Sequence, residues 1–218
     1  MKKLFKAIRN NDFKLVKEMI DNSPELVNSV AKQPPKKDDG QSPLQIAIKT
    51  GNFDIAEYLI DKGANLDFME DESCCNDWRT PVLFDAVNAA VMNCRWNANS
   101  ETDGFRSFSS EEKANQSFEL LKKMLILGAN INFKDSLGNT VIWRFCLQAN
   151  QILPAYDYEN DCEVNDRLLT KGLEADLHRI LKLLCAYGVD IDAKETSGGT
   201  SVKEYFTKGA MAKLLSEF

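Results

Sequence analysis

Histidine is almost absent from this sequence: His178 is the only one in 218 residues. A histidine-based catalytic triad would depend wholly on His178, which lies next to Arg179 on the polar side of a helical stripe. A solvated or helix-capping histidine is expected there. The sequence also lacks a Gly-rich phosphate loop, a His-Glu-x-x-His zinc motif and the Gly-x-Ser-x-Gly of many hydrolases. We therefore predict that the protein is not an enzyme and needs no cofactor.

The six cysteines form no metal or redox motif. No two of them are spaced as Cys-x-x-Cys, and a single histidine cannot complete a typical zinc site, so we predict no bound metal. Cys146 and Cys185 fall within apolar helical patterns and are expected to be small buried hydrophobic residues. Cys74 and Cys75 lie in a polar loop, where incidental thiols of a reducing compartment are expected and thiol chemistry is the alternative.

Long hydrophobic runs are also missing. No stretch approaches the roughly 20 apolar residues of a membrane-spanning helix. The N-terminal residues from Met1 to Phe5 are followed by charged and polar side chains, so neither a signal peptide nor a membrane anchor is expected. These features predict a cytoplasmic protein that does not bind a membrane.

Acidic residues outnumber basic ones, 33 to 27, which gives a formal net charge of −6. A nucleic-acid-binding protein would normally have a basic surface, so no nucleic-acid partner is expected. The acidity favours a basic partner through electrostatic attraction, although it also suits a protein that only needs to stay in solution. A hydrophobic content of 44% with 11 glycines and 6 prolines predicts a folded chain.

Three apolar stripes have the period of a helix with one buried face, over residues 53–60, 118–125 and 177–184. A glycine follows each stripe, at Gly63, Gly128 and Gly188, and is expected in the left-handed conformation that closes a helix. A second pattern opens each segment: Gly-Gln-Ser-Pro-Leu at 40–44 and Arg-Thr-Pro-Val-Leu at 79–83, with weaker copies from Gly138 and Gly199. Ser or Thr caps a helix, and Pro is favoured at its first position.

Together these patterns resemble the ankyrin repeat. The best match runs from Lys37 to Phe68, and Gln45 there replaces the usual histidine of the family. The resemblance covers nearly the whole chain. It implies an all-α fold, an ankyrin-repeat solenoid of stacked helix-turn-helix units with β-turn or hairpin fingers. The matching positions are Gly40, Ser42, Pro43, Leu44, Ala47, Gly51, Leu59, Ile60, Gly63 and Ala64.

We predict a single domain, residues 1–218, with modified ends because the terminal faces of a solenoid meet water. The opening residues Ser42, Thr80, Thr140 and Thr200 are 38, 60 and 60 residues apart, whereas the family period is about 33. Two repeats are therefore expected to carry long insertions between their helices. The predicted parts are an N-terminal capping unit (1–36), a repeat (37–68), a repeat (76–133) with insertion 92–115, a repeat (135–193) with insertion 149–174, and a C-terminal capping unit (195–218).

The two insertions occupy equivalent positions in adjacent repeats, so we expect them to lie side by side on one edge. Loops on a rigid scaffold often carry binding residues. The alternative is that each insertion simply extends the helices that flank it. The middle of the second insertion, residues 157–166, contains acids and no base.

Partner contacts in ankyrin-like arrays usually come from the finger tips and from the exposed side of the first helices. The resemblance implies such contacts at equivalent positions of this chain, and we add acidic and aromatic residues of the second insertion. Trp143 lies close to these positions but is equally suited to the core. The predicted binding residues are Asp38, Asp39, Gln41, Lys49, Asn76, Asp77, Trp78, Arg79, Asn88, Leu137, Asn139, Asp157, Tyr158, Glu159 and Asp161.

The resemblance therefore implies a monomeric, non-enzymatic module that binds another protein, through the concave and finger face or through the paired insertions. Short bacterial ankyrin proteins with long insertions are similar to the immunity proteins of polymorphic toxins. One alternative is thus an immunity protein that neutralises a basic, nuclease-like toxin. An alternative of another class is an enzyme or metal-binding protein with its site between the insertions.

Overall fold

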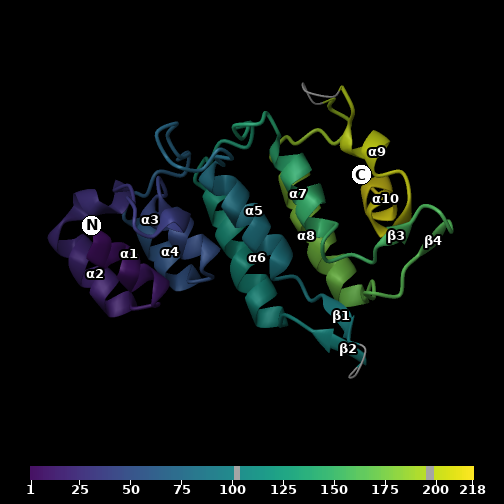
Figure 1. Cartoon of the computed structure of the whole chain (residues 1–218), viewed down its shortest axis with the longest axis horizontal. Coiled ribbons are helices and arrows are strands. Elements are labelled where there is room, and N and C mark those ends of the chain that lie inside the picture. The colour runs from purple at the N-terminus through teal and green to yellow at the C-terminus, as the bar shows by residue number, and fades with distance from the viewer. Residues whose placement is uncertain (101–103, 195–198) are drawn as a thin grey trace. The chain divides into compact units, whose positions relative to one another are not determined.

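The computed structural model describes residues 1–100, 104–194 and 199–218, which are mostly helical with two small hairpins (Figure 1). They form two compact units: unit 1 contains residues 1–89 and 120–137, and unit 2 contains residues 90–119 and 138–218. Helices α5 (Val82–Met92) and α6 (Glu111–Ile126) contribute residues to both units. No helix among the described residues is long and apolar enough to cross a membrane. Residues 101–103 of the predicted first insertion and 195–198 of the predicted C-terminal cap lie outside the described residues.

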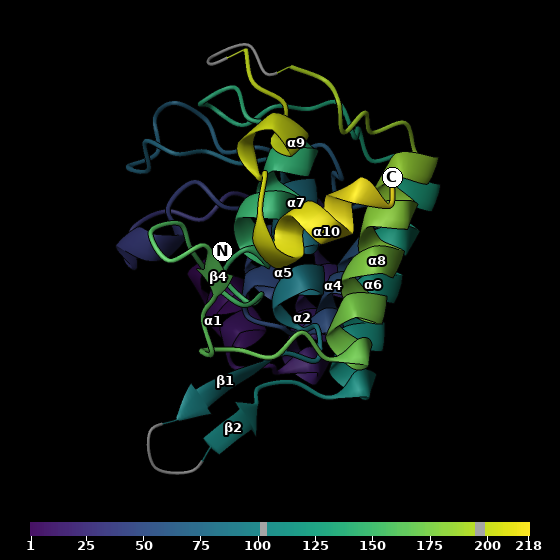
Figure 2. The same ribbon diagram turned by 90° about the vertical axis from the view of Figure 1, so that its right-hand side faces the viewer.

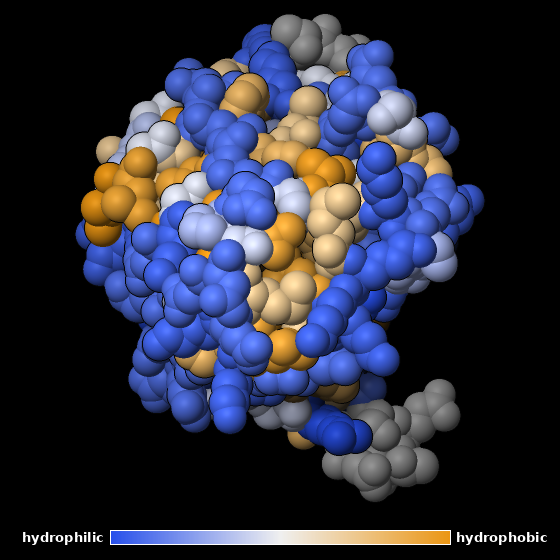
Figure 3. All heavy atoms as spheres, turned by 90° about the vertical axis from the view of Figure 1, so that its left-hand side faces the viewer, coloured by the Kyte–Doolittle hydropathy of each residue, from blue (hydrophilic) through white to orange (hydrophobic). Residues whose placement is uncertain are grey.

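Two helix pairs form the N-terminal part of unit 1. Helix α1 (Lys2–Arg9) packs against α2 (Phe13–Asn22) and α3 (Pro43–Lys49), and α4 (Phe53–Asp61) packs against both α2 and α3. Short 3₁₀ turns, η1 (Pro24–Asn28) and η2 (Lys36–Asp38), connect the pairs. Figure 3 views the N-terminal side of this unit, where hydrophilic side chains cover most of the face and hydrophobic areas lie between them. The fully buried core side chains include Leu4, Ile8, Ile20, Leu44, Ile55 and Leu59.

The predicted helix start is confirmed at Ser42, whereas Thr140 precedes α7 without a side-chain capping hydrogen bond. The Ser42 hydroxyl accepts a hydrogen bond from the backbone N–H of Gln45, and the Gln45 side chain accepts one from the N–H of Ser42, which completes a capping box. The glycines that follow the three apolar stripes, at 63, 128 and 188, have φ of 87°, 91° and 98°. In the last copy the capping residue is Ser201, one position after the predicted Thr200, because Ser201 is followed by Glu204 in a second capping box.

A buried polar network lies at the centre of unit 1. The Gln45 side chain is fully buried, and its Nε2 lies 3.1 Å from Glu70 Oε1, 3.1 Å from the Thr80 carbonyl and 3.2 Å from Asp85 Oδ2. Lys49 Nζ approaches Glu70 and Asp85 at 3.7 and 3.5 Å. Burial is the main reason that the pKa of Asp85 is raised to about 6. The positive charge of Lys49 lowers this pKa, and the negative charge of Glu70 raises it. Gln45 thus joins α3 to the start of α5 within unit 1.

Unit 2 contains the helices α7 (Val141–Ala149) and α8 (Lys171–Ala186) (Figure 2). They are followed by α9 (Val202–Tyr205) and α10 (Gly209–Ser216). Helix α7 packs against α8 and α9, and α9 packs against α10. The predicted insertion segments extend their flanking helices only in part, since α6 begins at Glu111 and α8 at Lys171, inside the predicted bounds. The all-α expectation was incomplete. Each segment contains a two-stranded antiparallel hairpin: β1 (Asn97–Ser100) with β2 (Gly104–Ser107), and β3 (Tyr156–Asp157) with β4 (Cys162–Glu163).

The raised pKa of Asp85 predicts a pH-dependent stability difference between the wild type and Asp85→Asn. The folded state holds the Asp85 proton more tightly than the unfolded state, so this group favours folding most at low pH. Its contribution is lost as the pH rises from about 4 through about 6. One pKa unit corresponds to about 1.4 kcal/mol. Between pH 4 and pH 7, the free energy of unfolding of Asp85→Asn should therefore rise by up to about 3 kcal/mol relative to that of the wild type.

Urea denaturation at a series of pH values measures this difference. Glu57→Gln, which makes the same acid-to-amide change at an exposed position of α4, is the control and should show no such trend. A stability difference for Asp85→Asn that does not change with pH would contradict the role given to burial.

Candidate functional site

Two of the predicted binding residues, Asp38 and Gln41, are buried and bonded within unit 1. The Asp38 side chain forms an ion pair with Arg9, and the backbone carbonyl of Gln41 accepts a hydrogen bond from Ala31. Both Asp38 and Gln41 are only 6% exposed, so neither side chain is presented on the surface as the prediction assumed. The physical reason is that the turn before α3 folds back against residue 31 and buries these side chains instead of presenting them.

Asp39 and Lys49 remain accessible but are bonded within unit 1, whereas Asn88 lies on α5. The Asp39 carboxylate accepts hydrogen bonds from Cys75 and Gln33, which lower its pKa. Lys49 is engaged with the two buried acids described above. Asn88 is half-buried, and its amide oxygen is buried without a hydrogen-bond partner.

The fingers near Trp78 are tied together. Trp78 is 41% exposed, and its indole N–H donates a 2.7 Å hydrogen bond to Asp135. The backbone N–H of Arg79 donates to the Ser136 hydroxyl. Asn76, Asp77 and Leu137 are exposed, and Asn139 is half-buried.

The predicted residues of the second insertion gather around the β3–β4 turn of unit 2. Tyr158, Glu159 and Asp161 are exposed, whereas Asp157 is half-buried. The Asp157 carboxylate accepts hydrogen bonds from the backbone of Glu159 and from the backbone and side chain of Asn160, which lower its pKa. Asp157 therefore shapes the turn, and its neighbours face solvent.

The two insertion segments touch each other within unit 2. The Asn97 side chain donates to the Leu168 carbonyl at 3.3 Å and accepts from the Leu168 N–H at 3.0 Å. The backbone N–H of Asn99 donates to the backbone carbonyl of Asp166 at 2.8 Å. The side-chain amide of Asn99 donates to the backbone carbonyl of Asn165 at 3.2 Å. Backbone polar groups of one segment are thus satisfied by the other. We call the exposed surface formed by residues 93–100, 104–110 and 150–170 the insertion surface.

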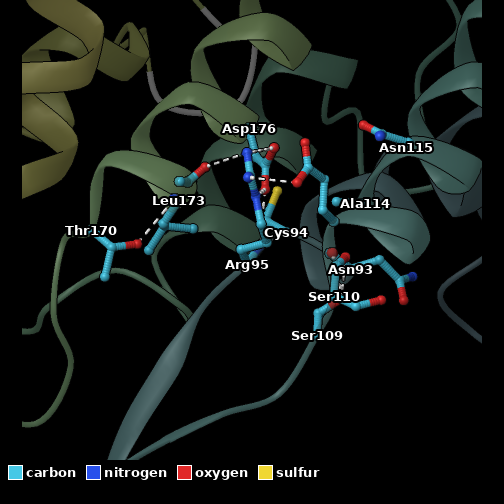
Figure 4. A network of polar contacts seen from close by, with 12 residues as sticks. Asn93, Cys94, Arg95, Ser109, Ser110, Ala114, Asn115, Thr170, Leu173 and Asp176 are labelled. Carbon is cyan, nitrogen blue, oxygen red and sulfur yellow. Dashed lines mark hydrogen bonds and ion pairs between the residues drawn. The ribbon is translucent and has the colours of Figure 1, made fainter.

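An ion pair that the sequence analysis missed anchors this surface (Figure 4). Arg95 donates to both carboxylate oxygens of Asp176, from Nε and Nη2 at 2.9 Å each, and its backbone N–H donates to the same carboxylate at 3.0 Å. Arg95 Nη2 also donates to the carbonyl of Gly172 at 3.3 Å. A Cβ added to Gly172 would lie 3.3 Å from Arg95 Nε, so the small residue leaves room for the guanidinium. Such two-pronged bonds between Arg and a carboxylate are strong and directional.

A second arginine completes the network. Arg179 Nη2 lies 3.2 Å from Asp176 Oδ1, and its Nη1 donates to Asn115 Oδ1 at 2.6 Å. Its guanidinium also stacks 4.6 Å from the ring centre of Phe118. The Asp176 side chain is 1% exposed and therefore depends on these cations.

Aromatic side chains cover the first segment of the insertion surface. The rings of Trp96 and Phe108 stack with centres 4.4 Å apart, and Trp96 donates from its indole to the Met92 carbonyl. Phe105, Phe108 and Leu168 are exposed. Solvent-accessible aromatic residues on a rigid scaffold are typical of protein interfaces.

Three titratable side chains, those of His178, Cys94 and Cys146, have surroundings that the structure defines. The imidazole of His178 is partly exposed, lies 3.4 Å from the Glu217 carboxylate and contacts Phe218. Burial raises the pKa of the Cys94 and Cys146 thiols, which keeps both protonated. Within residues 1–100, 104–194 and 199–218, no group of three or more His, Cys, Asp or Glu side chains is placed to hold a metal ion.

Residues 4–95 match the family model for ankyrin repeats in three copies. A segment of 64 residues, 29% of this chain, is 36% identical to part of "Ankyrin repeat and SAM domain-containing protein 6" from Mus musculus and covers 7% of that protein. Ankyrin repeats are generally protein–protein interaction modules and usually lack enzymatic activity. The family match ends at Arg95, before the first hairpin, so most of the insertion surface lies outside it.

Arg95→Ala should destabilise unit 2, because it leaves the buried Asp176 carboxylate without its two-pronged partner. Breaking a buried pair from one side costs about 3 to 5 kcal/mol, and we expect about 3 kcal/mol here because Arg179 remains. Urea denaturation measures this loss, and hydrogen exchange should become faster in β1 and β2. Arg106→Ala removes an exposed arginine from the same hairpin and serves as the control. Equal stability of the two variants would contradict the anchoring role of Arg95.

Proposed function

We propose that this protein is a non-enzymatic, monomeric, cytoplasmic module that binds another protein through the insertion surface of unit 2. The observation that carries the proposal is the Arg95–Asp176 network, which fixes a surface of exposed aromatic and acidic side chains. A loop that serves only as a connection needs no buried ion pair, whereas a binding surface loses less entropy when it is held in place beforehand. The repeats, as in other ankyrin proteins, would supply the rigid support.

The fingers of unit 1 are a second contact region in this proposal. Asn76, Asp77, Trp78, Arg79 and Leu137 are at least partly exposed there. Trp78 supports the idea most directly, since its indole N–H is already bonded to Asp135 while the residue stays 41% exposed. Because Asp38 and Gln41 are buried, the contact would be restricted to the tips.

A basic partner is favoured by the exposed acids of the second insertion. Glu159, Asp161 and Glu163 are exposed, and residues 157–166 contain no base, although Lys208 pairs with Asp161 and Lys213 with Glu163. An acidic patch of this kind attracts a basic protein and fixes its orientation. This observation supports the narrower proposal of an immunity protein that covers a basic, nuclease-like toxin, whose own substrate would also be polyanionic.

Site-specific photo-cross-linking in cells of the source organism tests the proposal. A photoreactive amino acid at Phe108 or at Tyr158 should give an adduct with the same partner, because the two exposed positions belong to one surface. The same amino acid at Glu57, exposed on α4, is the control and should not give that adduct.

Adducts formed only at position 57, or only at a finger position such as Leu137, would contradict binding through the insertion surface. Mass spectrometry of the adduct then identifies the partner. A basic nuclease would support the narrower proposal, and an acidic partner would contradict it.

A further inference from the structure

A hollow of about 480 Å³ lies within unit 2, between the second hairpin and the C-terminal helices. Figure 1 shows β3 and β4 beside α10, and α10 contacts β4. We call this feature the tyrosine hollow. Its lining includes Tyr156, Tyr158, Tyr205, Phe206 and Lys208.

Two phenol rings of the tyrosine hollow face solvent. Tyr158 is 61% exposed and Tyr205 is 59% exposed, although each is held at one edge. The Tyr158 ring makes an edge contact with Tyr156 at 5.1 Å between centres, and the Tyr205 ring makes one with Trp143 at 5.3 Å. Rings that are braced by neighbours and still open offer their faces to a ligand at little further entropic cost.

The tyrosine hollow already holds one positive charge, which belongs to the chain itself. Lys208 Nζ lies 5.7 Å from the centre of the Tyr156 ring and forms an ion pair with Asp161. The Tyr156 hydroxyl donates to the same carboxylate at 2.6 Å, which helps to lower the pKa of Asp161. An aromatic face beside a carboxylate is the combination that binds an organic cation.

Gly209 fixes the ring that takes part in this arrangement. A Cβ added there would lie 3.0 Å from Tyr156 Cδ2, and the φ of Gly209 is 71°. The Tyr156 ring can therefore lie against the backbone at the start of α10. This close approach brings the ring, Asp161 and Lys208 together from segments that are far apart in the sequence.

We propose that the tyrosine hollow binds an arginine side chain of the protein partner, a refinement that rests on the proposed function. The net charge of −6 and the exposed acids of the second hairpin favour a basic ligand. Arginine fits better than lysine, because its planar guanidinium stacks on aromatic faces and forms forked bonds with a carboxylate. An anionic ligand is disfavoured because Asp161 neutralises Lys208.

Nuclear magnetic resonance of ring-labelled tyrosine tests this assignment. The chain has five tyrosines, and Tyr58 and Tyr187 do not line the hollow, so they serve as internal controls. The probe is a soluble peptide of alternating arginine and glycine, and its matched control carries citrulline, which keeps the shape and removes the charge. We expect saturable shifts of the Tyr158 and Tyr205 resonances with the arginine peptide alone.

Two pairs of variants separate ring stacking from general charge attraction. The double variant Tyr158→Ala/Tyr205→Ala should bind the arginine peptide about tenfold more weakly, because it loses two exposed cation–π contacts. The control variant Tyr187→Ala should bind the peptide as tightly as the wild type. Lys208→Ala should strengthen binding about threefold or more by freeing Asp161. Lys213→Ala removes an equal charge near Glu163, outside the lining of this hollow, and should strengthen binding less.

Absence of binding, or binding that the Tyr158→Ala and Tyr205→Ala substitutions do not weaken, would overturn the assignment. If the photo-cross-linked partner is still captured from Phe108 in that case, the protein-binding proposal stands and only the arginine site fails. Loss of both the cross-link and the peptide shifts would contradict both proposals.

Discussion

The carboxylate of Asp176 is buried in α8, and a buried charge has to be neutralised by a partner of opposite sign. Arg95 supplies that partner from the segment that follows α5, and its backbone N–H bonds to the same carboxylate. This requirement fixes where the first insertion segment begins. The side chain of Asn97 then meets Leu168 of the second segment, so both segments are ordered by one electrostatic constraint.

Buried or partly buried carboxylates connect distant segments elsewhere in the chain as well. Asp38 pairs with Arg9, Asp85 lies beside Gln45 and Lys49, and Asp135 accepts from Trp78. In each case, the carboxylate joins segments that are far apart in the sequence. Other acids remain exposed, among them Glu159, Asp161 and Glu163 of the second hairpin. Acidic side chains therefore contribute directly to the architecture of the chain.

The helical repeats could be predicted because their signals are local. The apolar stripe before Gly63 and the Ser42 capping box each depend on a few neighbouring residues. The hairpins could not be predicted, since β1 and β2 are rich in Asn and Ser and lack the alternating pattern of a buried strand. The burial of Asp38 depends on a turn that packs against residue 31, which no local pattern indicates. One signal was overlooked: Asp176 lies among Leu173, Leu177 and Ile180 on the buried face of α8, and an acid in that position requires a partner.

Whether a partner contacts the insertion surface is measured most directly by hydrogen–deuterium exchange. The exchange of the chain alone is compared with that of its complex with the partner identified by cross-linking. Slower exchange in the complex over β1, β2 and residues 154–168, and at residues 205–209 if an arginine enters the tyrosine hollow, is the predicted result. Protection limited to the finger residues 74–80 and 135–137, or to α2 and α4, would contradict it.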